Sequence, residues 1–154
     1  MPKNEIVITP LQIYKVPILI VEHGEGTIYK ISDNHCAKMP SGNRYKTDMF
    51  YEIKMCRLLY SLGISVPEPI TCDYVNVRDK VEIGYIMEYV EGISWHDKSI
   101  SKKDNILAHN LLHRELKLTS SLGFSLYNEE AQWILTKDEK IKLIDFTNWK
   151  YKGL

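Results

Sequence analysis

Short stretches rich in β-branched and aromatic residues fill the first part of the chain. They occupy residues 17–24, 27–32, 35–39, 70–77 and 82–90, and Gly, Pro, Asn, Asp or other polar residues separate them. Runs of this length and composition, bounded by turn residues, are typical of strands. The pattern therefore predicts five strands, of which the first three form an antiparallel meander.

Two longer segments have helical periodicity. In residues 44–63 apolar side chains recur at steps of three and four, and Gly63 is suited to end the helix. Residues 102–122 repeat the pattern, with Ser101 as a candidate N-cap and Gly123 after the last turn. We expect one helix in the first segment and either one long helix or two abutting helices in the second.

The last part of the chain has the pattern of a hairpin. Residues 132–135 and 140–146 are two apolar runs joined by the polar turn TKDEK. Together with the preceding elements, this hairpin indicates an α+β fold. We expect a single domain over residues 1–154, with one lobe over about 1–90 and a second over 91–154.

The composition of the chain argues against nucleic acids and membranes as binding partners. Twenty Lys and Arg balance twenty Asp and Glu, so no basic field attracts nucleic acid or an anionic membrane. The longest apolar run, VPILIV at residues 16–21, is far shorter than the roughly 20 residues that span a bilayer, and no leader opens the chain. Cys36, Cys56 and Cys72 contain no CxxC pair, which favours reduced thiols. We expect a cytoplasmic protein that binds neither nucleic acid nor membrane.

Two features of the first lobe suggest an anion site. Gly24 and Gly26 form a G-x-G between two predicted strands, where glycines let backbone amides approach a phosphate, although a tight β-turn is the commoner explanation of this spacing by itself. Lys38 lies within an apolar strand, where an ammonium needs an acid or a phosphate nearby, and Glu52 in the following helix is its natural partner. The alternative is a strand-edge lysine whose ammonium reaches water.

A family resemblance links these features. The order GEGTIYKI, HCAK, YEIKMCRLLYSLGISVPEPI, GYIMEYVEG and KIKLIDF resembles the eukaryotic-type protein kinase superfamily over residues 18–149. Within it, LLYSLGISVPEPI followed by GYIMEYVEG most resembles the compact RIO-type and aminoglycoside-phosphotransferase-like branches. The resemblance implies a minimal protein-kinase-like fold, with a five-stranded antiparallel N-terminal lobe carrying one helix and a truncated helical C-terminal lobe carrying a β-hairpin.

The resemblance also implies roles in nucleotide binding. Gly24 and Gly26 would cover the phosphates of ATP, with Tyr29 where a third glycine is expected. Lys38 would contact the α and β phosphates, and Glu52 would orient Lys38.

Further roles fall on the hinge and the metal site. Residues Glu88 to Val90 would form the hinge beside the nucleotide. Asp145 would be both a catalytic residue and the ligand of Mg²⁺, with Thr147 in place of the usual glycine.

Two stretches compete for the catalytic loop. HRELKL, which contains Glu115, matches the family pattern by letter but lies within the predicted long helix. The family separates its two aspartates by roughly 18 residues, and counting back from Asp145 reaches Tyr127. Ser125 to Tyr127 then replace His-Arg-Asp, and Gln132 replaces the metal-binding Asn. A phenol with a pKa near 10 accepts the substrate proton poorly.

Three functions remain open. The first is an ATP-binding pseudokinase or weakly active atypical kinase that acts through a protein partner. The second is an active small kinase, of Ser/Thr in proteins or of small molecules, that positions its acceptor with Glu129 or Glu130. The alternative for these two glutamates is that they are charged loop residues exposed to solvent. The third is a nucleotide-free interaction scaffold, favoured by Tyr29, Thr147 and the missing catalytic aspartate.

The chain ends at Leu154, soon after Asp145, so the later helices of a full kinase are expected to be absent. This loss would leave apolar surface on the long helix and around Trp133 and Trp149. A protein partner or a second copy of the chain, in a homodimer, would cover that surface. The alternative is that the short tail folds back over it.

Overall fold

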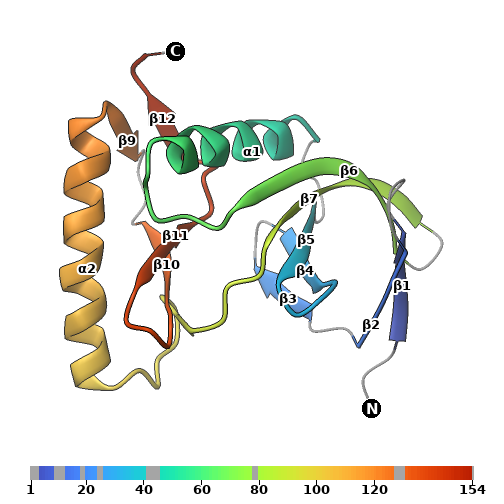
Figure 1. Ribbon diagram of the computed structural model, residues 1–154, viewed down its shortest axis with the longest axis horizontal. Helices are drawn as coiled ribbons and strands as arrows, with labels where there is room; N and C mark the ends of the chain where they lie inside the picture. Colours follow the sequence, from blue (N-terminus) through green and yellow to red (C-terminus); the bar gives the residue numbers. More distant parts are fainter. Residues whose placement is uncertain are drawn as a thin grey trace. The chain divides into compact units, whose positions relative to one another are not determined.

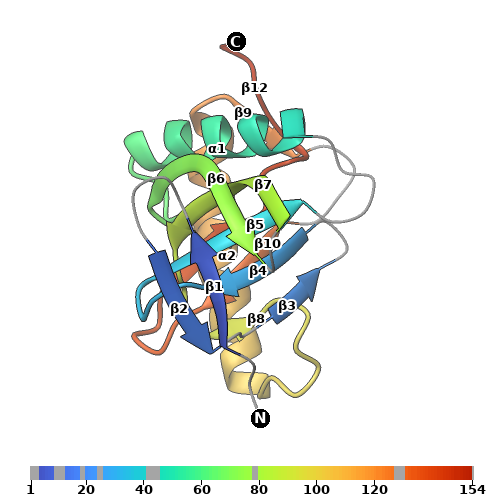
Figure 2. The same ribbon diagram turned by 90° about the vertical axis from the view of Figure 1, so that its right-hand side faces the viewer.

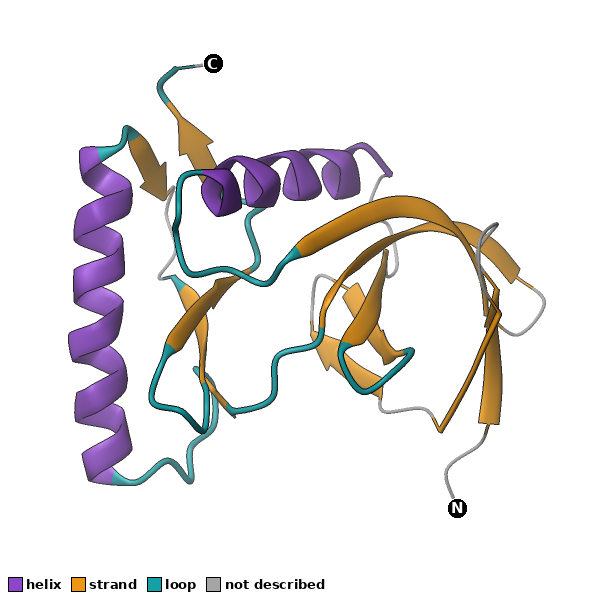
Figure 3. Ribbon diagram, in the orientation of Figure 1, coloured by secondary structure: helices purple, strands orange, loops and turns teal. Residues whose placement is uncertain are grey.

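The computed structural model describes residues 4–8, 13–17, 20–23, 26–40, 46–77, 80–126 and 131–153. They form two compact units: the first comprises Met1–Ile53 and Glu68–Tyr89, and the second comprises Lys54–Pro67 and Val90–Leu154. Within the described ranges, the chain has two helices and three antiparallel sheets. Figure 1 labels the elements, and Figure 3 colours them by type. The α+β class expected from the sequence is confirmed.

The first unit contains a seven-stranded antiparallel sheet in the order β2-β1-β6-β7-β5-β4-β3. Figure 2 shows β2 and β3 at its opposite edges. The strands are β1 Asn4–Ile8, β2 Ile13–Pro17, β3 Ile20–His23, β4 Gly26–Lys30, β5 His35–Pro40, β6 Pro69–Val77 and β7 Lys80–Glu88.

The five predicted strands correspond to β3 through β7, and the sequence did not predict β1 and β2. These two strands pair fully with each other, but β1 meets β6 through the single register pair Ile8 and Asn76. Neither NEIVI nor IYKVP alternates apolar and polar residues over its whole length, so the strand pattern in the sequence is weak.

A small apolar core lies on the central strands of this sheet. The core consists of five buried side chains that pack together: Ile31, Ala37, Met39, Val75 and Ile86. The partly buried ring of Tyr29 packs against them. Gly84 on β7 leaves room for this packing, because a methyl group there would lie 2.6 Å from Sδ of Met39 and 2.9 Å from Cγ2 of Val75. The absence of a side chain at Gly84 is therefore a packing requirement.

Helix α1, Lys46–Ser61, follows the predicted periodicity. Its spaced apolar residues are almost fully buried: Met49, Ile53, Cys56 and Leu59. The helix ends shortly before Gly63, whose φ of 82° is a conformation that glycine adopts without steric cost. Residues 46–53 of this helix belong to the first unit and residues 54–61 to the second.

In the second unit, α2 is one continuous helix, Lys102–Ser121. The hydroxyl of Ser101 accepts a hydrogen bond of 3.1 Å from the backbone N–H of Asp104, so the predicted N-cap is confirmed. Gly123, with φ of 95°, follows the helix. Among the residues that the structure describes, neither helix combines the length and the apolar character needed to cross a bilayer.

Short strands complete the second unit. The sheet β11-β10-β8 joins β10 Gln132–Leu135, β11 Ile141–Ile144 and β8 Ile93–Ser94. The predicted hairpin is β10 and β11, closed by a 2.8 Å hydrogen bond from the N–H of Thr136 to the carbonyl of Lys140. A separate two-stranded sheet pairs β9 Phe124–Leu126 with β12 Trp149–Tyr151.

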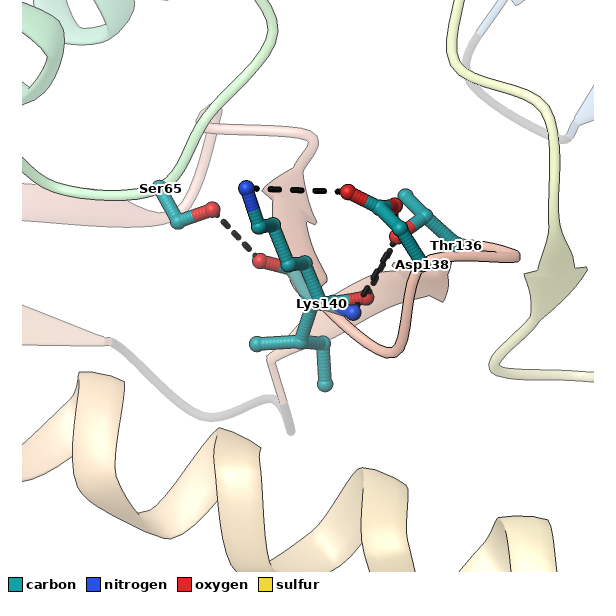
Figure 4. A network of polar contacts seen from close by, with 5 residues as sticks. Ser65, Thr136, Asp138 and Lys140 are labelled. Atoms are coloured by element: carbon teal, nitrogen blue, oxygen red, sulfur yellow. Dashed lines mark hydrogen bonds and ion pairs between the residues drawn. The ribbon is translucent and has the colours of Figure 1, made fainter.

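The segment after α1 is attached to the hairpin through Ser65, as Figure 4 shows. The hydroxyl of Ser65 donates a 2.6 Å hydrogen bond to the carbonyl of Ile141, and the N–H of Leu143 donates to the carbonyl of Ser65 at 2.9 Å. The hairpin turn has its own contacts, from the Thr136 hydroxyl to Asp138 and from Asp138 to Lys140. Ser65 therefore extends the edge of β11 with backbone and side-chain bonds.

The expected exposure around the two tryptophans is wrong. Trp133 is 4% exposed and packs with Ala108, Leu135 and Ile141, while Trp149 is 1% exposed. Trp133 is buried because residues of α2 pack against it. Trp149 is buried in a segment that pairs with β9 as strand β12. The long helix does expose Ile106 and Leu118, as expected.

Candidate functional site

Lys38 and Glu52 form a buried ion pair in the first unit. Nζ of Lys38 lies 2.7 Å from Oε1 of Glu52, and their side chains are 6% and 2% exposed. Lys38 is on β5, between Ile28 of β4 and Tyr85 of β7 in the ladder. The predicted pairing is confirmed, and the alternative of a strand-edge lysine that reaches water is wrong.

Burying the charges of Lys38 and Glu52 costs free energy. Each charge loses most of its hydration, which costs several kcal/mol per ion and is offset only by close pairing. At 2.7 Å the hydrogen bond is charge-assisted, which holds the ammonium at a defined place on the sheet. A cation fixed in this way can attract an anion without ordering a flexible side chain first.

The implied phosphate-covering loop is only partly described. Gly24 lies outside the described residues, as do the residues between Pro40 and α1. Gly26 begins β4, opposite His23 on one side and Pro40 on the other. The role of the two glycines toward a phosphate stays a prediction.

The residues at the end of β7 are held by backbone contacts. The N–H of Glu88 donates to the carbonyl of Glu68 at 2.9 Å, and the Glu88 carboxylate accepts from the N–H of Glu68 at 3.0 Å. The N–H of Tyr89 donates to the carbonyl of Asn34 at 2.8 Å. Val90, which follows, is half-buried. A hinge role for Glu88 and Val90 also stays a prediction.

Cys36 lies beside this segment. Its thiol donates a weak hydrogen bond of 3.7 Å to the carbonyl of Glu88. Burial raises the pKa of Cys36 to about 12, despite the opposing effect of the Lys38 ammonium. The thiol therefore stays protonated at neutral pH, and Cys36 lacks the thiolate that a nucleophile requires.

In the second unit, Asp145 directly follows β11 in an unusual backbone conformation. Its φ is 58°, in the left-handed region that residues other than glycine rarely adopt. Oδ1 of Asp145 accepts a 2.6 Å hydrogen bond from the Thr147 hydroxyl and a longer one, 3.4 Å, from the Thr147 N–H. Strained backbone conformations of this kind are concentrated at binding and catalytic sites. They direct a side chain to a position that it could not reach from a regular β-strand.

Two buried aromatic residues anchor the turn that carries Asp145. Phe146 is 2% exposed, Trp149 is 1% exposed, and their ring centroids lie 6.2 Å apart. The N–H of Trp149 donates to the carbonyl of Phe146 at 3.2 Å. The backbone after Asp145 is therefore fixed by packing as well as by hydrogen bonds.

Gln132 lies near Asp145 in the same unit, because its register partner on β11 is Ile144, the residue before Asp145. A carboxylate and an amide oxygen are hard donors, which suit Mg²⁺ when a substrate phosphate and water complete its coordination. In the described part of the chain, no three His, Cys, Asp or Glu side chains gather to hold a metal ion by themselves. The types of donor at these two positions therefore suit a magnesium ion that is shared with a phosphate ligand.

The catalytic segment lies mostly outside the described residues, which exclude Tyr127, Glu129 and Glu130. Ser125, at the start of this segment, lies in β9. The described structure therefore does not test the catalytic roles expected of Tyr127, Glu129 and Glu130.

The competing motif HRELKL lies inside α2, as its periodicity predicted. The Glu115 carboxylate accepts a hydrogen bond from the N–H of Ser65, and burial raises its pKa. Glu115 therefore links the segment after α1 to α2, rather than belonging to a loop.

Sequence reasoning missed two of these contacts. It treated Thr147 only as a departure from glycine, although a hydroxyl residue two positions after an aspartate is a familiar turn pattern. It also missed the contact between Ser65 and Glu115, which joins residues far apart in sequence and has no local signal.

No family model and no curated protein matches the sequence. A solved structure does resemble the fold, described as "Legionella pneumophila Lpg2603 kinase bound to IP6". The TM-score is 0.55 and the sequence identity is 17%, over 98% of this chain and 60% of that chain. The fold of this protein is therefore kinase-like, and the chain spans about 60% of the length of that kinase.

Proposed function

We propose that this protein is an ATP-binding, kinase-like protein, a pseudokinase or weakly active atypical kinase, which acts through a protein partner. The observation that carries the proposal is the buried ion pair between Lys38 and Glu52. Burying a lysine and a helix carboxylate in the middle of a sheet costs desolvation free energy, and apolar residues could fill the same space without that cost. A purely structural role therefore does not require this pair. In a kinase-like fold, the same arrangement serves to bind nucleotide phosphates.

In this proposal each of the paired residues has a defined task. Lys38 binds oxygens of the α and β phosphates, and Glu52 keeps the ammonium oriented. Asp145 and Gln132 would hold a magnesium ion, whose positive charge would offset the negative charge of a phosphate ligand. Lys38 and Glu52 belong to the first unit, and Asp145 and Gln132 belong to the second.

The expectation of weak phosphoryl transfer comes from the catalytic segment. Tyr127 stands where the resemblance implies an aspartate, and a neutral phenol accepts the proton of an acceptor hydroxyl poorly. Positioning and electrostatics nevertheless carry most of phosphoryl transfer, so a missing base lowers the rate without forbidding the reaction.

The second candidate is therefore an active small kinase, with a transferase activity that uses Glu129 or Glu130. The ordered carboxylate of Asp145 favours this candidate over a nucleotide-free scaffold. Within kinase-like folds, the order of segments around residues 58–92 supports the compact RIO-type or aminoglycoside-phosphotransferase-like branch.

Thermal unfolding with and without ATP and Mg²⁺ tests the proposal. A ligand that binds the native state must stabilise it, by about 2.7 kcal/mol at 100 times its dissociation constant. We expect the melting temperature of the wild type to rise, and the rise to vanish in Lys38→Ala and Asp145→Asn. Lys140→Ala is a matched control, because this lysine is exposed and pairs with Asp138 on the hairpin.

The remaining outcomes separate the candidate functions. Magnesium-dependent release of ADP that is lost in Lys38→Ala and Asp145→Asn would favour the active kinase. The absence of any shift in the wild type would contradict nucleotide binding and leave the scaffold. Because the solved kinase is described as bound to IP6, IP6 without metal is a useful second ligand in the same assay.

A further inference from the structure

Thr147 contacts Asp145 more closely than any glycine at this position would. The Thr147 hydroxyl donates to Oδ1 of Asp145 at 2.6 Å, and the Thr147 N–H contributes a longer contact of 3.4 Å. A glycine offers the N–H alone. The hydroxyl thus adds the shorter of the two hydrogen bonds, and a hydrogen bond to a carboxylate is stronger than one between neutral groups.

The backbone on both sides of Asp145 is already fixed. On one side lies the β10 and β11 ladder, which ends at Gln132 and Ile144. On the other side Phe146 and Trp149 are buried, and Trp149 begins the β12 strand paired with β9. With the backbone held, the direction of the carboxylate depends on the side-chain torsions of Asp145. The Thr147 hydroxyl restricts these torsions.

We propose that Thr147 is a positioning residue, whose hydroxyl holds the Asp145 carboxylate in the orientation that binds the divalent cation of a metal–nucleotide complex. This inference rests on the proposed function, because it assigns Asp145 to the metal. It adds that the threonine is an adaptation of the site rather than a sign of its decay. Residues that orient a metal ligand through a hydrogen bond typically change metal affinity by about 10- to 100-fold when they are replaced.

Packing alone does not account for the contact. Thr147 is only half-buried, while its neighbours Phe146 and Trp149 supply the packing of this segment. Replacing threonine by valine keeps the size and branching of the side chain and removes the hydroxyl. Thr147→Val therefore separates the hydrogen bond from the packing, and Thr147→Ser restores the hydroxyl without the methyl group.

The experiment measures Mn²⁺ binding by electron paramagnetic resonance, with Mn²⁺ and ATP as the probes. It compares the wild type with Thr147→Val, Thr147→Ser and Asp145→Asn, and records the melting temperature of each protein without ligand. We expect Mn²⁺ to bind about 10-fold more weakly to Thr147→Val in the presence of ATP. Thr147→Ser should bind like the wild type, and Asp145→Asn should bind most weakly.

Each other outcome overturns a defined part of the account. Wild-type affinity in Thr147→Val, with loss in Asp145→Asn, would refute the role of Thr147 and leave the proposed function intact. Equal loss in Thr147→Val and Thr147→Ser would overturn the positioning role of the hydroxyl, because serine keeps the hydroxyl and lacks only the methyl group. No binding of Mn²⁺ and ATP by the wild type would refute the proposed function, and the inference with it.

Discussion

Nζ of Lys38 and Oε1 of Glu52 lie 2.7 Å apart, and both side chains are almost completely shielded from water. The pair joins the middle of a seven-stranded sheet to a helix within one compact unit. Two charges in such surroundings stabilise the fold only while both are present, because either one alone would be buried without compensation. This mutual dependence leads to the first prediction.

Lys38→Met should destabilise the protein by about 3–5 kcal/mol, because it leaves the Glu52 carboxylate buried without its partner. The double variant Lys38→Met/Glu52→Leu should recover most of this loss, since apolar residues of similar volume often replace a buried pair at little cost. Urea unfolding followed by circular dichroism measures both. Equal stability of the single variant and the wild type would mean that the pair is not buried in solution.

Gly92→Ala should destabilise the protein more than Gly84→Ala. A methyl group on Gly92 would run into the backbone carbonyl of Leu135, which cannot move without disturbing β10. At Gly84 the nearest atom is the sulfur of Met39, the far part of a flexible side chain. Overpacking typically costs about 1–3 kcal/mol, and we expect Gly92→Ala at the upper end. The reverse order in thermal unfolding would contradict these contacts.

Glu115 should make stability depend on pH. Burial raises its pKa in the folded protein, so the unfolded chain loses its proton at lower pH than the folded chain does. Stability is therefore fully present below the ordinary value of 4.5 and falls as pH rises through the folded pKa. Glu115→Gln should remove this decline while its amide oxygen still accepts from Ser65.

Melting temperatures of the wild type, Glu115→Gln and Glu115→Ala between about pH 4 and pH 7 test this relation. Glu115→Ala should be less stable than Glu115→Gln, because the N–H of Ser65 loses its acceptor. One carboxylate oxygen of Glu115 is buried without a hydrogen-bond partner among the described residues, which adds to the cost of the charged form. An unchanged pH profile in Glu115→Gln would contradict the assignment.

The three cysteines should differ in reactivity. Cys36 and Cys56 are buried, and the pKa of Cys36 is raised to about 12 by burial, whereas Cys72 is partly exposed. Alkylation of the native protein at neutral pH should therefore modify Cys72 first and reach the other two only on unfolding. Mass spectrometry after timed exposure to iodoacetamide measures the order. Modification of Cys36 as fast as Cys72 would show that β5 is open to solvent.

Local patterns were sufficient to predict the longer elements. The periodicity of α1 and α2, the N-cap at Ser101 and the turn between β10 and β11 depend on residues close together in sequence. The pairing of Lys38 with Glu52 was predictable because an ammonium on an apolar strand requires a partner.

Features that depend on distant residues were not predictable in the same way. The strands β8, β9 and β12 have two or three residues, too few to show a period, and they form only because distant segments meet. The burial of Trp133 and Trp149 has the same origin, since α2 and the returning tail cover them. The Thr147 contact combines a local turn pattern, which the sequence does show, with the left-handed backbone at Asp145, which that pattern does not specify.

Calorimetric titration of the protein with ATP and Mg²⁺, repeated on Lys38→Ala and Asp145→Asn, decides whether this protein has a kinase-type nucleotide site. We expect the wild type to bind ATP with Mg²⁺ and both variants to lose this binding, while each variant retains the circular dichroism of a folded protein. Binding that survives both substitutions, or no binding to the folded wild type, would contradict a kinase-type nucleotide site built on these residues.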